Sequence, residues 1–131
     1  MLLDTSGLLA YHSQRESEHE DARNFLNQAS NKTTHSYVLA ELIALATARK
    51  YLRPPILAFV KALLAHPRIE VVWVTQDLNA AALSLLEARP DKGHSLADAV
   101  SFVLMRERNV TEALSTDRHY DQEGFTRLLG P

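Results

Sequence analysis

Short β-prone runs alternate with helix-length segments along this chain, and this alternation constrains the fold more than any other feature. The expected strands cover residues 1–5, 32–35, 71–74 and 112–116, with a weaker one at 126–129. The expected helices cover residues 8–11, 17–29, 36 to 49 or 50, 54 to the proline at 67, 78–88 and 95–108. Because neighbouring parallel strands need a crossover connection, this order predicts an α/β fold with a mostly parallel sheet.

Local signals set several of the expected boundaries. Ser17, with Glu20 three residues later, predicts a capping box at the start of a helix. Ser36 is the expected cap of the next helix, and Pro54-Pro55 suits the first turn of the one after it. The continuous β-branched and aromatic run at residues 71–74 is typical of a strand covered on both faces.

Length and composition limit the class of protein. The 131 residues suit a single domain over residues 1–131 with a sizeable core. Apolar residues make up 46% of the chain and charged residues 23%, which argues against a disordered or coiled-coil protein. The 14 Lys and Arg face 16 Asp and Glu, a net charge of −2, so this is no strongly basic nucleic-acid binder.

Two absences narrow the class further. The chain has no cysteine, which excludes a disulfide framework, a thiolate metal site and a Cys nucleophile. No apolar run approaches the roughly 20 residues of a membrane span, and the start Met1-Leu2-Leu3-Asp4 lacks the basic residues of a signal peptide. These features predict a cytoplasmic protein with no membrane segment.

Four acidic residues stand where a merely structural carboxylate is unusual: Asp4, Glu41, Asp98 and Asp117. Each also has an ordinary explanation. Asp4 can be a helix cap or a turn residue, Asp117 can be a turn residue at a strand end, and Asp98 completes a capping box with Ser95. Glu41 lies in the apolar run 38–46, where a buried charge is costly unless it is paired. The alternative for Glu41 is a partly exposed place on a narrow polar stripe.

The shared placement of these four acids is more informative than any one of them. Asp4 and Asp117 end expected parallel strands, and the other two lie in the first or second turn of a helix. Such positions converge on the crevice outside the carboxyl ends of the strands. Like charges gathered there repel one another, and a bound cation relieves the repulsion. Oxygen donors, without cysteine or a matched histidine pair, favour Mg²⁺ or Mn²⁺ over zinc. Asp121 is a further candidate for a supporting role.

At this point the chain resembles the PIN-domain ribonucleases, and most of all the VapC-type toxins of bacterial toxin–antitoxin pairs. The resemblance rests on five short segments in order: LDTS at 3–6, AEL at 40–42, SLADAVSF at 95–102, STDRHY at 115–120 and GF at 124–125. Each segment is weakly diagnostic alone, whereas their order and spacing are fairly specific. Together they extend over essentially the whole chain.

The resemblance implies a three-layer α/β/α sandwich and Mg²⁺-dependent hydrolysis of RNA phosphodiesters. It implies that Asp4, Glu41, Asp98 and Asp117 form an acidic quartet that binds the metal. The neighbouring hydroxyl groups of Thr5, Ser6 and Thr116 would position a ligand or water. Family members usually form homodimers, and the toxins are held inactive by a cognate antitoxin protein.

Contact with RNA requires positive charge near this site. The candidates are four basic side chains: Arg49, Lys50, Arg53 and Arg118. For Lys61 and Arg68, ordinary solvated side chains are the better interpretation. The helix that carries residues 56–64 is apolar over a wide arc; core packing is its default explanation, and with Tyr51 and Leu52 it also offers a dimer or antitoxin surface.

Other functions remain open at this stage. A non-catalytic module that binds RNA or a partner on the same fold is the main alternative. A Mg²⁺-dependent phosphatase of the haloacid-dehalogenase type needs a second Asp two residues after the first, where this chain has Ser6. A receiver domain needs an acidic neighbour of Asp4, and flap-type DNA nucleases carry more acids and more chain.

Overall fold

The computed structural model describes all 131 residues and contains a five-stranded, all-parallel sheet. Its strands run in the order β3-β2-β1-β4-β5. Their bounds are β1 Leu2–Leu3, β2 Lys32–His35, β3 Ile69–Val72, β4 Glu112–Leu114 and β5 Thr126–Arg127. The parallel arrangement brings the carboxyl ends of all five strands to one edge of the sheet, here called the carboxyl edge, and their amino ends to the opposite amino edge.

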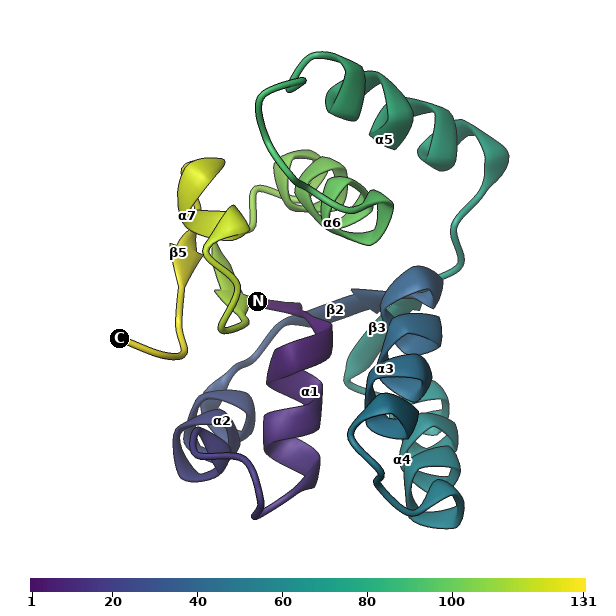
Figure 1. Ribbon diagram of the computed structural model, residues 1–131, viewed down its shortest axis with the longest axis vertical. Coiled ribbons are helices and arrows are strands. Elements are labelled where there is room, and N and C mark those ends of the chain that lie inside the picture. Colours follow the sequence, from purple (N-terminus) through teal and green to yellow (C-terminus); the bar gives the residue numbers. More distant parts are fainter.

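Helices cover both faces of the sheet, which confirms the predicted three-layer α/β/α sandwich (Figure 1). One layer holds α1 Thr5–His12, α2 His19–Gln28, α3 Ser36–Ala48 and α4 Arg53–Ala65. The other holds α5 Gln76–Glu87 and α6 Leu96–Glu107, and a short α7, His119–Gln122, precedes β5. No helix has the length and hydropathy needed to cross a membrane.

Alternating side chains of the central strands build a core on each face. Leu3 and Leu114 belong to the larger core, which they share with residues of α1 to α4. Their neighbours Leu2 and Ala113 point the other way and pack with Phe102 of α6. This is the period of two expected for strands buried on both faces, and it holds the carboxyl edge between two rigid layers.

Helix α1 passes very close to β4. A Cβ atom added to Gly7 would lie 1.9 Å from the carbonyl oxygen of Leu114, so no larger side chain fits there without a shift of the backbone. The close approach lets the backbone N–H of Thr116 donate to Ser6 Oγ at 3.0 Å. The start of α1 and the end of β4 therefore form one continuous wall at the carboxyl edge.

Several predicted boundaries are wrong at the strand ends. The first strand stops at Leu3, and α1 begins at Thr5 with Asp4 at its N-cap, because the chain turns into a helix immediately after the buried pair of leucines. The N-cap of α2 is Glu18, not Ser17, and it makes no side-chain capping bond. The last strand is only Thr126–Arg127.

The cap of α3 and the end of β3 also differ from expectation. His35, not Ser36, caps α3 by accepting from Val38 N at 3.4 Å. Ser36 Oγ instead accepts from Val74 N at 3.0 Å. Because β3 is an edge strand that ends at Val72, Trp73 has left the sheet and is 64% exposed, so the prediction of a strand covered on both faces through residue 74 is wrong.

Candidate metal centre

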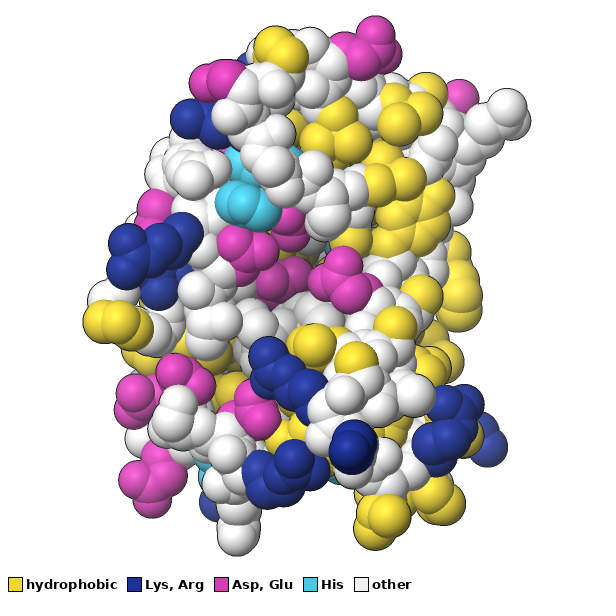
Figure 2. Space-filling view, in the orientation of Figure 1, with side chains coloured by type: hydrophobic (Ala, Val, Ile, Leu, Met, Phe, Trp, Pro, Cys, Tyr) yellow, Lys and Arg dark blue, Asp and Glu magenta, His cyan; other side chains and the backbone are white.

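Three carboxylates meet at the carboxyl edge of the sheet. One oxygen each of Asp4, Asp98 and Asp117 lies within 4.8 Å of the others, and we call these three residues the acidic cluster. Asp4 follows β1, Asp117 follows β4 and Asp98 lies in the first turn of α6. Figure 2 shows acidic side chains gathered in a hollow in the middle of this face, between the upper and lower helices.

Asp4 occupies a helix N-cap position without acting as a cap. Its side chain makes no capping hydrogen bond to α1. Its Oδ2 instead accepts from the hydroxyl group of Ser115 at 2.7 Å. The ordinary explanation of Asp4 as a capping residue therefore does not account for where its carboxylate points.

Asp98 serves two purposes at once. The predicted capping box is confirmed, because Asp98 N donates to Ser95 Oγ at 3.0 Å and Ser95 N donates to Asp98 Oδ2 at 3.1 Å. Asp98 is also 96% buried, and an oxygen of its carboxylate belongs to the acidic cluster. A capping carboxylate thus takes part in the cluster without losing its structural bond.

Glu41 lies opposite the acidic cluster, in the second turn of α3. It is half-buried and accepts from Thr5 Oγ1 at 2.6 Å. It stands outside the group of three close oxygens, but it lines the same cavity of about 290 Å³ as Asp4, Thr116 and Asp117. The fourth predicted acid is therefore brought to the rim of the cavity rather than into its tightest part.

The electrostatic setting of Asp4 fits a cation. Burial, with smaller contributions from the charges of Asp98 and Glu41, raises the pKa of Asp4 to about 7, against the opposing hydrogen bond from Ser115. No Lys or Arg forms an ion pair with the acidic cluster or with Glu41. A proton or a cation must supply the missing charge, and oxygen donors of this kind suit a hard divalent ion.

Ser115 holds the cluster together, although no pattern in the sequence marks it as a site residue. Its hydroxyl group donates to Asp4 and accepts from Asp117 N at 2.9 Å. It also lies 3.2 Å from Ser6 Oγ. The only sequence signal was its place beside Thr116 at a strand end, because its contacts with Asp4 and Ser6 connect residues more than a hundred positions apart.

Two histidines accompany the acids, so the expectation that no matched histidine pair is present is wrong. Ring nitrogens of His94 and His119 lie within 4.8 Å of each other and of an Asp98 oxygen. His119 Nδ1 is 2.8 Å from Asp98 Oδ2 and 3.5 Å from Asp117 Oδ1. Since His94 and His119 are 25 positions apart, only the packing of α6 against α7 brings them together.

Comparison with known proteins decides the family. The sequence model of the PIN-domain family matches residues 1–125 of this chain. This chain belongs to the PIN-domain family. Among solved structures, it is similar to the crystal structure of VapC20 from Mycobacterium tuberculosis, described as a sarcin–ricin loop cleaving toxin, with a TM-score of 0.86 and 25% identity over 95% of each chain. Comparison with curated proteins gives no significant match.

Asp121 does not reach the acidic cluster of this PIN domain. Its Oδ2 accepts from Arg127 Nε at 2.9 Å, on the side of α7 that faces β5.

The four basic side chains predicted to contact RNA differ in whether they already have a partner within the protein. Arg49 is tied to Glu16 at 2.6 Å and Arg53 donates to Thr47. Lys50 and Arg118 are exposed and form no ion pair.

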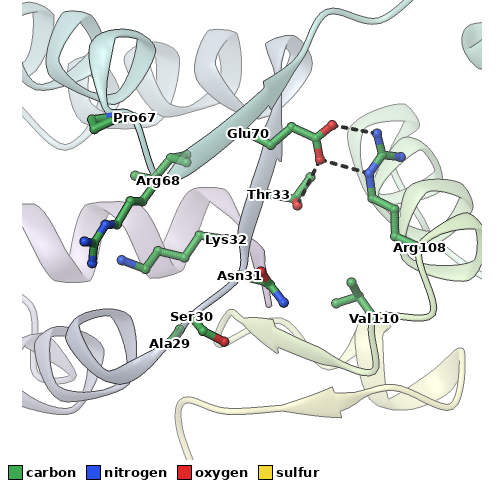
Figure 3. A pocket seen from close by; sticks show the side chains of 11 residues that line it. Ala29, Ser30, Asn31, Lys32, Thr33, Pro67, Arg68, Glu70, Arg108 and Val110 are labelled. Carbon is green, nitrogen blue, oxygen red and sulfur yellow. Dashed lines mark hydrogen bonds and ion pairs between the residues drawn. The ribbon is translucent and has the colours of Figure 1, made fainter.

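The largest hollow of the PIN domain is at the amino edge of the sheet, far along the strands from the acidic cluster. It has a volume of about 740 Å³ and is lined by residues at the starts of β2 and β3 and by Arg108 and Val110 (Figure 3). Its one carboxylate, Glu70, accepts two hydrogen bonds from Arg108, at 2.9 and 3.0 Å. These bonds lower the pKa of Glu70, so this hollow offers no unpaired acid to a cation.

Proposed function

We propose that this PIN domain is a metal-dependent endoribonuclease that hydrolyses RNA phosphodiester bonds. The observation that carries the proposal is the acidic cluster itself: three carboxylates within 4.8 Å, one of them with a strongly raised pKa, and no Lys or Arg to neutralise them. The membership in the PIN family and the likeness to a toxin that cleaves the sarcin–ricin loop support the choice of RNA as substrate.

Asp4, Asp98 and Asp117 would hold Mg²⁺ or Mn²⁺, with Glu41 at the rim of the same cavity as the fourth acidic ligand. When bound, such an ion supplies a water of lowered pKa and neutralises charge on the phosphate under attack. The donor set is all oxygen in this part of the site, which is the set that these two ions prefer. No side-chain nucleophile is then required.

The neighbouring side chains fix the positions of the ligands. Ser115 donates to Asp4, and Thr5 donates to Glu41, so each carboxylate keeps one oxygen oriented. The N–H of Asp117 donates to Ser115, and the N–H of His119 donates to Asp117 Oδ1 at 2.9 Å. This network holds the acidic cluster in place before an ion arrives, which lowers the cost of binding one. Ser6 and Thr116 complete the wall beside the cavity.

RNA would lie across the carboxyl edge with its backbone on basic side chains. Arg118 directly follows Asp117 and is exposed, and Lys50 is exposed at the end of α3. Arg49 and Arg53 take part only if RNA competes with their present partners, Glu16 and Thr47. Figure 2 shows Lys and Arg side chains below the acidic hollow on the same face. Such contacts make RNA affinity fall as salt rises.

The likeness to VapC20 also suggests a toxin that is restrained by an antitoxin protein and acts in the cytoplasm, as a single domain over residues 1–131. The surface of α4 and the residue before it suit a homodimer or an antitoxin contact, because Leu52 is 75% exposed and Leu57 and Leu64 are also exposed. Light scattering after size exclusion tests the dimer; a monomer at high concentration would contradict it.

Labelled RNA and DNA, incubated with and without Mg²⁺, test the proposed activity. We expect RNA cleavage that needs Mg²⁺, stops in excess EDTA and is lost in Asp98→Asn. Binding of RNA without cleavage in any divalent ion would favour the non-catalytic module. Preferential cleavage of DNA would favour a DNA nuclease, and release of phosphate from a monoester without cleavage of RNA would favour a phosphatase.

A further inference from the structure

We propose that His94, Asp98 and His119 form a second divalent-cation site that takes a nitrogen-preferring transition metal such as Zn²⁺ or Co²⁺ and shares Asp98 with the acidic cluster. We call these three residues the histidine cluster. One ligand atom of each lies within 4.8 Å of the other two. Ligand atoms bound to one ion by bonds of about 2.1 Å lie at most about 4.2 Å apart, so a shift of these side chains by less than about 1 Å closes the site around an ion.

His94 carries the main evidence. Its side chain is wholly buried, and its Nδ1 has no hydrogen-bond partner. Its Nε2 lies 3.1 Å from Glu123 Oε1. A buried polar atom without a partner costs free energy, so native proteins seldom leave one. With the ring proton on Nε2 and directed to Glu123, Nδ1 carries a free lone pair, which is the form of histidine that binds metals.

Glu123 is arranged to orient His94 rather than to bind an ion itself. It accepts from Arg89 Nε at 3.0 Å and from Arg106 Nη2 at 2.7 Å, and only 2% of its side chain is exposed. Burial opposes its ionisation, but the hydrogen bonds from Arg106, Arg89 and His94 together hold the pKa of Glu123 below its usual value. A fixed carboxylate behind a histidine is the usual second layer of a metal site.

His119 and Asp98 complete the site on its open side. His119 Nδ1 is 2.8 Å from Asp98 Oδ2, and the ring of His119 meets that of His94 edge to face at 4.8 Å. The side chain of His119 is 29% exposed, so an ion can enter past it. Two nitrogens with one oxygen favour Zn²⁺, Co²⁺ or Ni²⁺ over Mg²⁺. The site therefore differs in ion preference from the acidic cluster beside it.

Binding of Co²⁺, measured without RNA by its visible absorption and by titration, tests this site independently of the proposed nuclease activity. We expect the wild-type protein to bind Co²⁺ with histidine-type absorption that Zn²⁺ abolishes and equimolar Mg²⁺ does not. His94→Gln should weaken Co²⁺ binding at least about tenfold. His66→Gln, at an exposed histidine far from the site, should change nothing, and Asp4→Asn should keep the absorption.

Unchanged Co²⁺ affinity in folded His94→Gln, or no such absorption in the wild type, would overturn the proposal. If His94→Gln does not fold, as judged by circular dichroism, His119→Gln gives the same test at a more exposed position. Loss of the absorption in Asp4→Asn but not in His94→Gln would assign the ion to the acidic cluster alone and would also overturn it. None of these outcomes depends on whether RNA is cleaved.

Discussion

Carboxylates at the two edges of the parallel sheet have opposite pKa shifts. At the carboxyl edge, Asp4 is buried beside other acids and its pKa is raised to about 7. At the amino edge, Glu70 is half exposed and paired with Arg108, and its pKa is lowered. The amino-edge hollow is the larger of the two, at about 740 Å³ against 290 Å³.

This difference shows that the size of a hollow does not locate the functional site in this protein. The larger hollow has its charges matched within the chain, so it gains little from a bound ion. The smaller one has no Lys or Arg paired with its carboxylates, and only His119 pairs with Asp98 and Asp117, so an ion would relieve both their repulsion and the cost of their burial. Unpaired charge, held in place by hydrogen bonds, is the more useful signal.

Removal of a carboxylate from each edge tests the comparison most directly. We expect Asp117→Asn to reduce Mg²⁺-dependent RNA cleavage by about 100-fold or more, because it removes one ligand while the amide keeps the shape of the side chain. Glu70→Gln, at the other edge, should cleave RNA at the wild-type rate. Initial rates on a labelled RNA measure both. Equal losses in the two variants would mean that the edges do not differ in function.

The next largest effect is expected at the close approach of α1 and β4, which shapes the carboxyl edge. Gly7→Ala should reduce the free energy of unfolding by about 3 kcal/mol, because its Cβ would overlap the carbonyl oxygen of Leu114. Gly93→Ala is the control, since a Cβ there meets nothing within 4 Å. Urea denaturation measures both. A Gly7→Ala protein as stable as Gly93→Ala would contradict this packing.

The raised pKa of Asp4 predicts a pH dependence of stability in EDTA. The folded state holds the Asp4 proton up to about pH 7, whereas the unfolded chain releases it near pH 4. The contribution of the bound Asp4 proton to the free energy of unfolding is therefore complete below pH 4 and is lost as pH rises to about 7. Asp4→Asn should remove this loss and raise the melting temperature at pH 8 by about 5 °C. A lower melting temperature of Asp4→Asn at pH 8 would refute the buried, uncompensated charge.

The smallest effect, and the opposite sign, is expected at the amino edge. The lowered pKa of Glu70 means that its bond to Arg108 stabilises the fold at neutral pH and that this contribution disappears as pH falls below about 4.5. Glu70→Gln should cost about 0.5 kcal/mol at pH 7, because an exposed ion pair is screened by solvent. Urea titrations at pH 7 and at pH 3 measure it; a larger cost at pH 3 would reverse the expected sign.

Much of the fold was open to prediction from local patterns. The alternation of strands and helices predicts the parallel three-layer arrangement, and the Ser95–Asp98 spacing predicts the capping box. The errors fall at strand ends and edges. Trp73 looks like part of a buried strand by its residue type, yet β3 is an edge strand that ends before it. Residue type alone does not say which strand lies at an edge.

The candidate site was likewise predictable from the sequence only in part. Asp4, Asp98 and Asp117 could be proposed from their places at strand and helix ends, because a parallel sheet brings such places together. Ser115 and the pair His94 and His119 could not, since Ser115 is distant in sequence from Asp4 and His94 is distant from His119, and these contacts depend on how α6, α7 and β4 pack.

The sequence by itself determined the order of strands and helices, the capping box of Ser95 and Asp98 and the number of acids available at the carboxyl edge, because these depend on contacts within a few residues. Only the tertiary structure decided which acids stay unpaired, which hydroxyl group joins them and that two histidines stand beside Asp98. The physical reason is that burial and pairing are properties of three-dimensional packing: Asp4 and Glu70 are both ordinary carboxylates in the sequence, and their surroundings alone shift their pKa values in opposite directions.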